Sequence, residues 1–310
     1  MNFNEILYGV AYYDEYMPYD RIETDFKMIR DAGMNVIRIA ESTWSTWEPE
    51  EGVFDFTHLH RMLDCAAKYE LKVIVGTPTY AVPSWLAKKY PDILAVTHNG
   101  KELYGHRQNM DITNPDYLHH AQIIIEKLME QVKDYDCVIG FQLDNETKPY
   151  DTCSKYAQAK FVEYLKNEFP DIDEFNREFG LDYWSNRVND WDDFPDVRGT
   201  INQSLAAEFC KFQRSLVTKF LSWQADIVRE YKRDGQFITQ NFDFDWTTHS
   251  IGYQSQVDQY DASRCMTVAG ADIYHPSNEE LTGAEITVCG NISRSLKKDN
   301  YLILETEAQG

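Results

Sequence analysis

The sequence of this 310-residue chain predicts an α/β fold, a (β/α)8 TIM barrel truncated after its seventh strand. Seven short apolar runs alternate with segments of helical periodicity, the order expected of parallel strands joined by right-handed crossovers. Neither GxGxxG nor GxxxxGK(S/T) follows any run, so the phosphate-binding turn of many doubly wound sheets is absent. Polar and aromatic residues gather instead where the runs end, which is where barrel enzymes build their sites.

The predicted strands are short runs rich in β-branched and aromatic residues. In chain order they cover 6–13, 35–42, 72–79, 137–144, 236–244, 268–276 and 300–308. The predicted helices between them cover 19–32, 57–69, 117–132 and 204–231. In the first of these helices Ile22, Phe26 and Ile29 share one face, and Gly33 can end the helix just before the second strand.

A single catalytic domain is expected over 1–310, because α/β barrels of this length are commonly one domain. The stretch at about 151–201 is rich in Asp, Trp and Phe and is expected to be a helical insertion after the fourth strand. The chain stops at Gly310, soon after the seventh predicted strand. We therefore expect the eighth βα unit and any later domain to be absent from it, which leaves two strand edges exposed.

The formal net charge of −21 argues against binding to nucleic acid or to an anionic membrane surface, since both need basic patches. The N-terminal stretch lacks the basic and apolar segments of an export signal, and no apolar run approaches membrane-spanning length. These features predict a cytoplasmic protein. The six cysteines are scattered without a CxxC pair, so reduced thiols are expected and no metal site is predicted.

Two of the apolar runs end in carboxylates, GFQLDNE and LETE. Because the fourth and seventh strands lie on roughly opposite sides of an eight-stranded barrel, Glu146 and Glu305 are expected to face each other across its mouth. Two carboxyl groups about 5 Å apart suit retaining glycoside hydrolysis, in which one protonates the leaving oxygen and the other attacks the anomeric carbon. Asn145 can donate its amide to a sugar hydroxyl. Glu307 is the alternative nucleophile, and a strand-end Glu is often only a solvated terminus or an ion-pair partner.

Several stretches together resemble glycoside hydrolase family 42, whose members are mostly β-galactosidases. YGVAYYDEYMP resembles the opening strand of that family, and GMNVIRIAESTWSTWEPEEGVFDF is similar to its second βα segment. The family's later landmarks follow in order as GHRQNM, DNE, FNREFGLDYWS, TQNF, DIYHP and ILETEAQG.

The resemblance implies roles for six residues. They are Glu146 as acid/base, Glu305 as nucleophile, Arg107 and Asn145 as sugar-binding residues, Trp184 as part of the substrate wall, and Tyr274 as a neighbour of the nucleophile. Arg38 is expected either to support the nucleophile from behind or to form a salt bridge at the core edge. Some family members carry a four-cysteine zinc site, but only Cys153 lies near the corresponding place, so no zinc is expected.

The expected activity is that of a retaining exo-β-galactosidase that releases terminal galactose from oligosaccharides or small galactosides without a metal or organic cofactor. A related retaining glycosidase, acting on α-L-arabinopyranosides, β-fucosides or β-glucosides, is the alternative enzyme. A catalytically inactive sugar-binding fragment is the alternative from another class, because of the missing eighth strand. By the resemblance the protein is also expected to form a homo-oligomer, a trimer as is usual among its relatives.

Overall fold

The computed structural model describes residues 5–17, 20–105, 109–199, 202–244, 254–274 and 283–306. The strands in these ranges are β1 Gly9–Ala11, β2 Val36–Ile39, β3 Lys72–Gly76, β4 Val96–Thr97, β5 Gly100–Lys101, β6 Val138–Gln142, β7 Phe237–Thr239, β8 Asn241–Phe244, β9 Ala269–Ile273 and β10 Tyr301–Glu305. The helices are α1 Ile22–Asp31, α2 Trp44–Trp47, α3 Thr57–Lys68, α4 Ser84–Lys89, α5 Pro115–Val132, α6 Lys155–Glu168, α7 Ile172–Glu178, α8 Gln203–Tyr231, α9 Gln259–Ala262 and α10 Ala284–Lys297.

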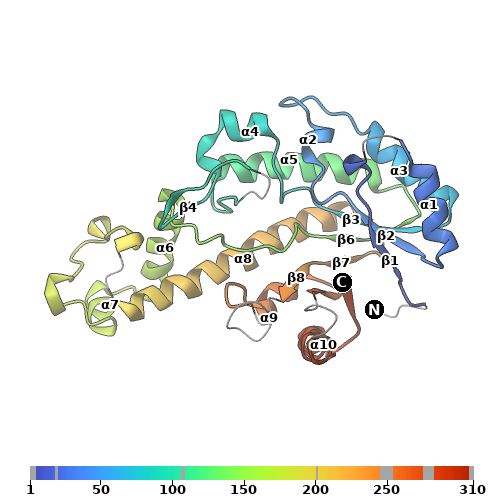
Figure 1. Ribbon diagram of the computed structural model, residues 1–310. Helices are drawn as coiled ribbons and strands as arrows, with labels where there is room; N and C mark the ends of the chain where they lie inside the picture. The colour runs from blue at the N-terminus through green and yellow to red at the C-terminus, as the bar shows by residue number, and fades with distance from the viewer. Residues whose placement is uncertain are drawn as a thin grey trace.

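Two parallel sheets make up the centre of the fold (Figure 1). The first has the order β1-β2-β3-β6-β7, and the second has the order β10-β9-β8. β7 and β8 follow each other along the chain with only Gln240 between them, so one extended segment contributes to both sheets. The strand order therefore runs continuously from β1 to β10, and all these neighbours pair in parallel.

The seven predicted strands are confirmed in position, but one of them is interrupted. The run at 236–244 is two short strands rather than one, because β7 pairs with β6 whereas β8 pairs with β9. The four predicted helices are confirmed as α1, α3, α5 and α8. Helix α10 was not predicted, nor was the small antiparallel hairpin of β4 and β5.

The strand order confirms a parallel α/β fold. No ladder joins β1 to β10 within the described residues, so the ring of strands is not closed there. A cavity of about 660 Å³ is lined by both of these strands and by Arg38 and Ile74 from β2 and β3. The carboxyl ends of all the parallel strands nonetheless lie at one end of the fold, as parallel pairing requires, and this end holds the site described below.

The stretch predicted as a helical insertion contains α6, α7 and three short 3₁₀ turns. Figure 1 shows α7 and the first turns of α8 extending well away from the strands. Phe161 and Phe175 are fully buried there and belong to the same apolar core as the helices around the sheets. The insertion is therefore anchored by aromatic packing to the rest of the molecule.

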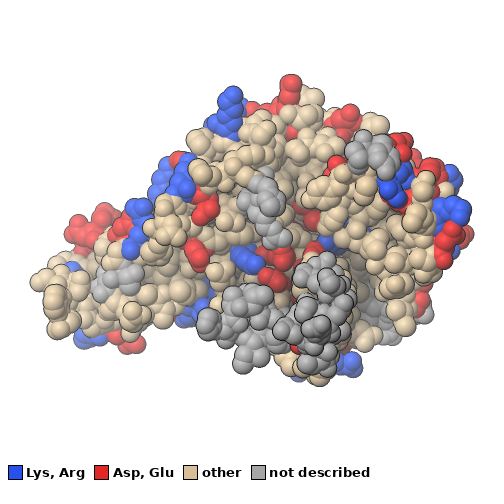
Figure 2. Space-filling model, viewed as in Figure 1, with Lys and Arg blue, Asp and Glu red and all other residues tan. Residues whose placement is uncertain are grey.

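Charged side chains of both signs are interspersed on the face shown in Figure 2, which carries no continuous basic area among its described residues. This agrees with the net charge of −21. Among the helices of the described residues, none is both long enough and apolar enough to cross a membrane.

Candidate active site

Glu305 ends β10 at an irregularity in the sheet. The pairing of β10 with β9 shifts between Ile303 and Glu305, and the shift places Glu305 opposite Asp272. A bulge of this kind redirects the side chains that follow it and is common next to active sites. The carboxylate of Glu305 consequently faces the residues at the ends of the neighbouring strands, and its side chain keeps 18% exposure.

Arg38 on β2 forms an ion pair with this carboxylate. One terminal nitrogen donates to Glu305 Oε1 at 2.5 Å and to Glu41 Oε1 at 3.0 Å, and the other donates to Gln142 Oε1 at 2.9 Å. Arg38 and Glu41 are buried, and the left-handed backbone of Ala40 (φ 95°) turns the chain between them. Burial alone would lower the pKa of Arg38, but Glu41 and Glu305 raise it well above its ordinary value. Arg38 is thus a fixed positive charge behind Glu305.

Two tyrosines complete this part of the site. The Tyr274 hydroxyl donates to Glu305 Oε2, so the two oxygens of Glu305 have different donors. Burial, and then the hydrogen bond to Glu305, raises the pKa of Tyr274, which keeps its hydroxyl protonated as a donor. The Tyr13 hydroxyl donates to Glu41 and accepts from Arg38 at 3.0 Å. The predicted position of Tyr274 against Glu305 agrees with this geometry.

Glu146 lies in a tight turn after β6. Both Asp144 (φ 48°) and Glu146 (φ 43°) have left-handed backbone, a strained arrangement that surrounding contacts must hold. The buried carboxylate of Asp144 accepts from Thr79 Oγ1 and Thr147 Oγ1, each at 2.6 Å, and its backbone nitrogen donates to Thr77 Oγ1 at 2.6 Å. Burial raises the pKa of Asp144 to about 6, against the lowering effect of the two threonines. Asp144 anchors the turn that presents Glu146.

Asn241 at the start of β8 connects the two acids. Its Oδ1 accepts from the backbone nitrogen of Glu146 at 3.0 Å. Its Nδ2 donates to Asn145 Oδ1 at 2.9 Å and lies 3.3 Å from Glu305 Oε1. The acids therefore share one hydrogen-bonding partner across the strand ends. Asn145 turns its oxygen toward Asn241 and its Nδ2 toward Glu146 Oε2, at 3.4 Å.

The structure thus brings together four of the six predicted site residues, Glu146, Glu305, Asn145 and Tyr274. Arg107 lies outside the described residues, as does Glu307, the alternative nucleophile. Trp184 is 79% exposed in the turn after α7, with left-handed backbone (φ 58°), and its ring makes an edge contact with Tyr183 at 5.8 Å between centroids. The roles expected for Arg107 and Trp184 remain predictions.

Four further residues of the site, for which no role was predicted, belong to the polar and aromatic residues in the later parts of predicted strands: Tyr13, Glu41, Asn241 and Asp272. Their shared signal is a polar or aromatic residue in the C-terminal half of a predicted strand. The buried Gln142 was not singled out, since it stands within the apolar run of β6. Sequence position alone could not show that these side chains contact one another.

The site has the donors and acids for nucleophilic and acid–base catalysis. A carboxylate held in place by a buried cation and a tyrosine hydroxyl has the chemistry of a nucleophile, and a second buried acid linked to it through Asn241 has the chemistry of a proton donor. No group of three or more His, Cys, Asp and Glu side chains within the described ranges is placed to hold a metal ion. The Cys153 thiol donates to the Val96 carbonyl oxygen instead, at 3.1 Å.

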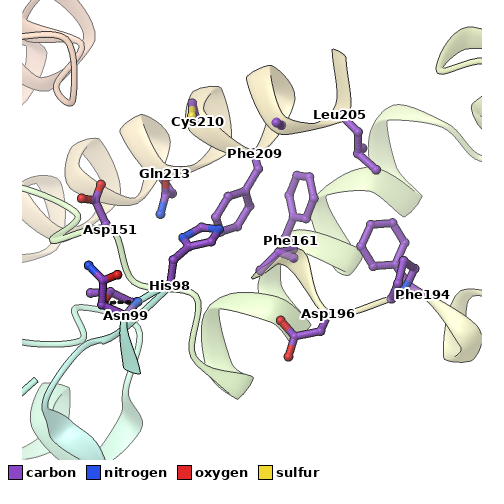
Figure 3. A pocket seen from close by; sticks show the side chains of 14 residues that line it. His98, Asn99, Asp151, Phe161, Phe194, Asp196, Leu205, Phe209, Cys210 and Gln213 are labelled. Atoms are coloured by element: carbon purple, nitrogen blue, oxygen red, sulfur yellow. Dashed lines mark hydrogen bonds between the residues drawn. The ribbon is translucent and has the colours of Figure 1, made fainter. Parts of the chain in front are cut away.

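A separate cavity of about 220 Å³ lies between the insertion and α8 (Figure 3). Figure 3 shows among its lining residues His98 from the β4–β5 turn, Phe209 of α8, and Phe161 and Phe194 of the insertion. Neither Glu146 nor Glu305 lines this cavity. Its wall combines phenylalanine rings with the polar side chains of His98, Asp151 and Asp196. The two predicted acids lie at the strand ends, which therefore remain the candidate active site.

Comparison with known proteins gives matches over nearly the whole chain. The profile of glycoside hydrolase family 42, described as beta-galactosidase, matches residues 11–309. The chain is 28% identical over 304 residues to beta-galactosidase BgaA of Clostridium cellulovorans, covering 96% of this chain and 45% of the relative. It is 30% identical over 273 residues to a beta-galactosidase of Thermus thermophilus, covering 86% of this chain and 41% of the relative.

A solved structure shows the same arrangement. A GH42 beta-galactosidase from G. stearothermophilus superposes with a TM-score of 0.87 at 26% identity, covering 97% of this chain and 45% of that one. The chain therefore spans less than half the length of these relatives.

Proposed function

This chain belongs to glycoside hydrolase family 42, and from that premise we propose that it is the catalytic domain of a retaining exo-β-galactosidase. The substrate is a terminal, non-reducing β-D-galactose residue on an oligosaccharide or small galactoside. The observation that carries the proposal is the arrangement at Glu305, whose two carboxylate oxygens accept from Arg38 and Tyr274 while Asn241 links it to the Glu146 turn.

In the first step Glu146 donates its proton to the glycosidic oxygen as the bond from that oxygen to the anomeric carbon breaks. Glu305 attacks the same carbon from the opposite face, forming a glycosyl-enzyme ester and releasing the leaving group as an alcohol. Arg38 and Tyr274 orient Glu305 for this attack. Their hydrogen bonds restrict its carboxylate to one position, which lowers the entropic cost of reaching the transition state.

In the second step Glu146, now ionised, removes a proton from water as the water oxygen attacks the anomeric carbon. The ester bond breaks, Glu305 leaves as a carboxylate, and galactose is released with its original anomeric configuration. The Asn145 Nδ2 group points to the same side as the Glu146 carboxyl, so it is positioned to donate to a sugar hydroxyl. Arg107 and Trp184 are proposed as further sugar contacts on the basis of the family resemblance.

The chemistry requires no metal or organic cofactor, because the two carboxyl groups supply both the proton and the nucleophile. A cytoplasmic location and a homo-oligomer, such as a trimer, belong to the same proposal. Related retaining glycosidase activities remain the second candidate, since arabinopyranosides, fucosides and glucosides would use the same two acids.

The test is a panel of nitrophenyl glycosides assayed with this chain. We expect hydrolysis of the β-galactoside to exceed that of the β-glucoside, β-fucoside and α-L-arabinopyranoside. Proton NMR of the first sugar released should show the β-anomer. A 2-deoxy-2-fluorogalactoside with an activated leaving group should label Glu305, located by peptide mass spectrometry. An α-anomer as first product, or galactose binding without turnover, would overturn the proposal.

A further inference from the structure

Asp272 on β9 is fully buried at the centre of the site and takes no part in the mechanism above. Its Oδ2 accepts from Asn241 Nδ2 at 2.7 Å. Its Oδ1 is also buried and has no hydrogen-bond partner among the described residues. Because of the bulge in β10, the residue paired with Asp272 across the sheet is Glu305. Asp272 is therefore buried, accepts one hydrogen bond among the described residues and lies beside another carboxylate.

The charges around Asp272 do not balance if it is ionised. Among the described residues, Arg38 is the cation that acts on it, and this guanidinium already binds the carboxylates of Glu41 and Glu305. One positive charge would then compensate three negative charges on buried or half-buried carboxylates. An unpaired buried charge is far more costly than a buried neutral group, so a proton on one of the three relieves the site.

Asp272 is the acid whose surroundings best accept that proton. Glu305 has a donor on each oxygen. Glu41 has a buried oxygen without a partner among the described residues, as Asp272 does, but its other oxygen binds the Arg38 cation directly. Asp272 accepts only from the neutral Asn241 amide. Burial first, and then the charge of Glu305, raises the pKa of Asp272 well above its ordinary value, whereas Arg38 opposes the shift and Glu146 adds to it. Tyr274, the other titratable neighbour, stays neutral.

Asn241 links the protonation state of Asp272 to the two predicted catalytic acids, Glu146 and Glu305. Its nitrogen has two hydrogens and faces three oxygens, those of Asp272, Asn145 and Glu305. Its oxygen faces the backbone nitrogen of Glu146. A flipped amide would place its oxygen against Asp272 and its nitrogen against the Glu146 N–H. The amide can therefore satisfy these groups in one orientation only.

We propose that Asp272 carries a proton in the resting protein and, through the Asn241 amide, acts as a positioning residue for the acid/base and the nucleophile. The proton lies on Oδ1, since Oδ2 accepts from Asn241. A neutral Asp272 leaves Glu305 as the ionised carboxylate facing Asn241. The kinetic consequences of this proposal rest on the proposed galactosidase function, but the protonation of Asp272 does not.

Infrared spectroscopy tests the protonation directly. At pH 7.5 the wild-type protein should show the C=O stretching band of a neutral carboxylic acid, and Asp272→Asn should lose it. Uniform labelling with carbon-13 aspartate assigns the band to an aspartate by its isotope shift. Asp144→Asn is the matched control, because Asp144 is also buried but has a pKa of about 6 and is ionised at this pH. If Asp272→Asn removes no neutral-acid band, Asp272 is ionised and the proposal fails.

Kinetics of two variants test the positioning role. Asp272→Asn keeps an oxygen acceptor for Asn241, whereas Asp272→Leu has a similar volume and no acceptor. Asp272→Leu should lower kcat about 100-fold, the order expected for a misplaced catalytic group, and Asp272→Asn should recover at least about tenfold of that loss. KM should stay within about twofold in both, since the Asp272 side chain is fully buried.

The comparison is made at a temperature where circular dichroism shows all three proteins folded. Equal losses of kcat in Asp272→Asn and Asp272→Leu would show that the negative charge itself is needed, and the proposal would be wrong. If the wild-type protein hydrolyses none of the glycosides, the proposed function fails, and the infrared result still decides the protonation of Asp272.

Discussion

Asp144 offers a test of how the turn before Glu146 is held. The change is Asp144→Asn, which keeps the shape of the side chain and removes its ionisation. The carboxyl is 2% exposed and is bound by Thr79 and Thr147. Its pKa of about 6 lies roughly two units above the ordinary 3.8, because burial disfavours the charged form.

The sign and size of the stability effect follow from this shift. At low pH both the folded and the unfolded chain hold the proton. As the pH rises past about 4 the unfolded chain loses it first, so the free energy of unfolding falls until the folded chain also loses it near pH 6. Two pKa units correspond to roughly 3 kcal/mol, of which about 2 kcal/mol should be lost between pH 4.5 and 7.5.

Urea unfolding at pH 4.5 and 7.5 measures this difference. Other titrating groups contribute equally to wild type and variant, so the wild type should lose about 2 kcal/mol more than Asp144→Asn between the two conditions. Asp136→Asn changes a fully exposed side chain and serves as the control. Its free energy of unfolding should change between the two pH values by the same amount as that of the wild type. If Asp144→Asn and the wild type respond identically to pH, the carboxyl does not titrate near 6 in the folded protein and the reasoning is wrong.

Three further predictions concern the acids and their donors. Glu146→Ala should release dinitrophenol from a dinitrophenyl galactoside in a fast burst followed by slow turnover, because an activated leaving group needs little protonation. Azide should restore turnover by forming the galactosyl azide, and absence of this rescue would argue against the acid/base role of Glu146. Glu305→Ala should lower kcat by about 10⁴-fold or more with every leaving group, and a larger loss in Glu307→Ala would reassign the nucleophile. Tyr274→Phe should lower kcat by about tenfold, because Glu305 loses one hydrogen-bond donor. The alkaline limb of the kcat pH profile should not move, because the raised pKa of Tyr274 keeps its hydroxyl protonated; a displaced limb would show that Tyr274 titrates during catalysis.

The unpredicted helix α10 shows where local sequence signals are insufficient. Gly290 lies in its interior, where glycine costs about 1 kcal/mol relative to alanine. A side chain at this position would collide with the Tyr301 hydroxyl of β10. Close packing of α10 against the strand therefore requires a residue that weakens the helical signal, and tertiary contacts stabilise the helix instead.

The split of the segment at 236–244 has a similar origin. Apolar and β-branched residues continue through both halves, so the sequence predicts one strand. Its two halves pair with different neighbours, β6 on one side and β9 on the other. The change of partner, which the residues of the segment do not specify by themselves, sets the interruption at Gln240.

By itself the sequence determined the alternation of strands and helices and the placement of acids at the ends of strands, because hydrophobic periodicity and the succession of elements along the chain are local properties. Glu146, Glu305, Asn145 and Tyr274 were identifiable on that basis together with the family resemblance. Only the tertiary structure decided which side chains share protons and charge. Arg38 meets Glu305 from 267 positions away, and Asn241 meets Glu146 from 95 positions away. Such contacts depend on strand register and on the bulge in β10, which arise from packing among all the strands at once and leave no pattern in any one of them.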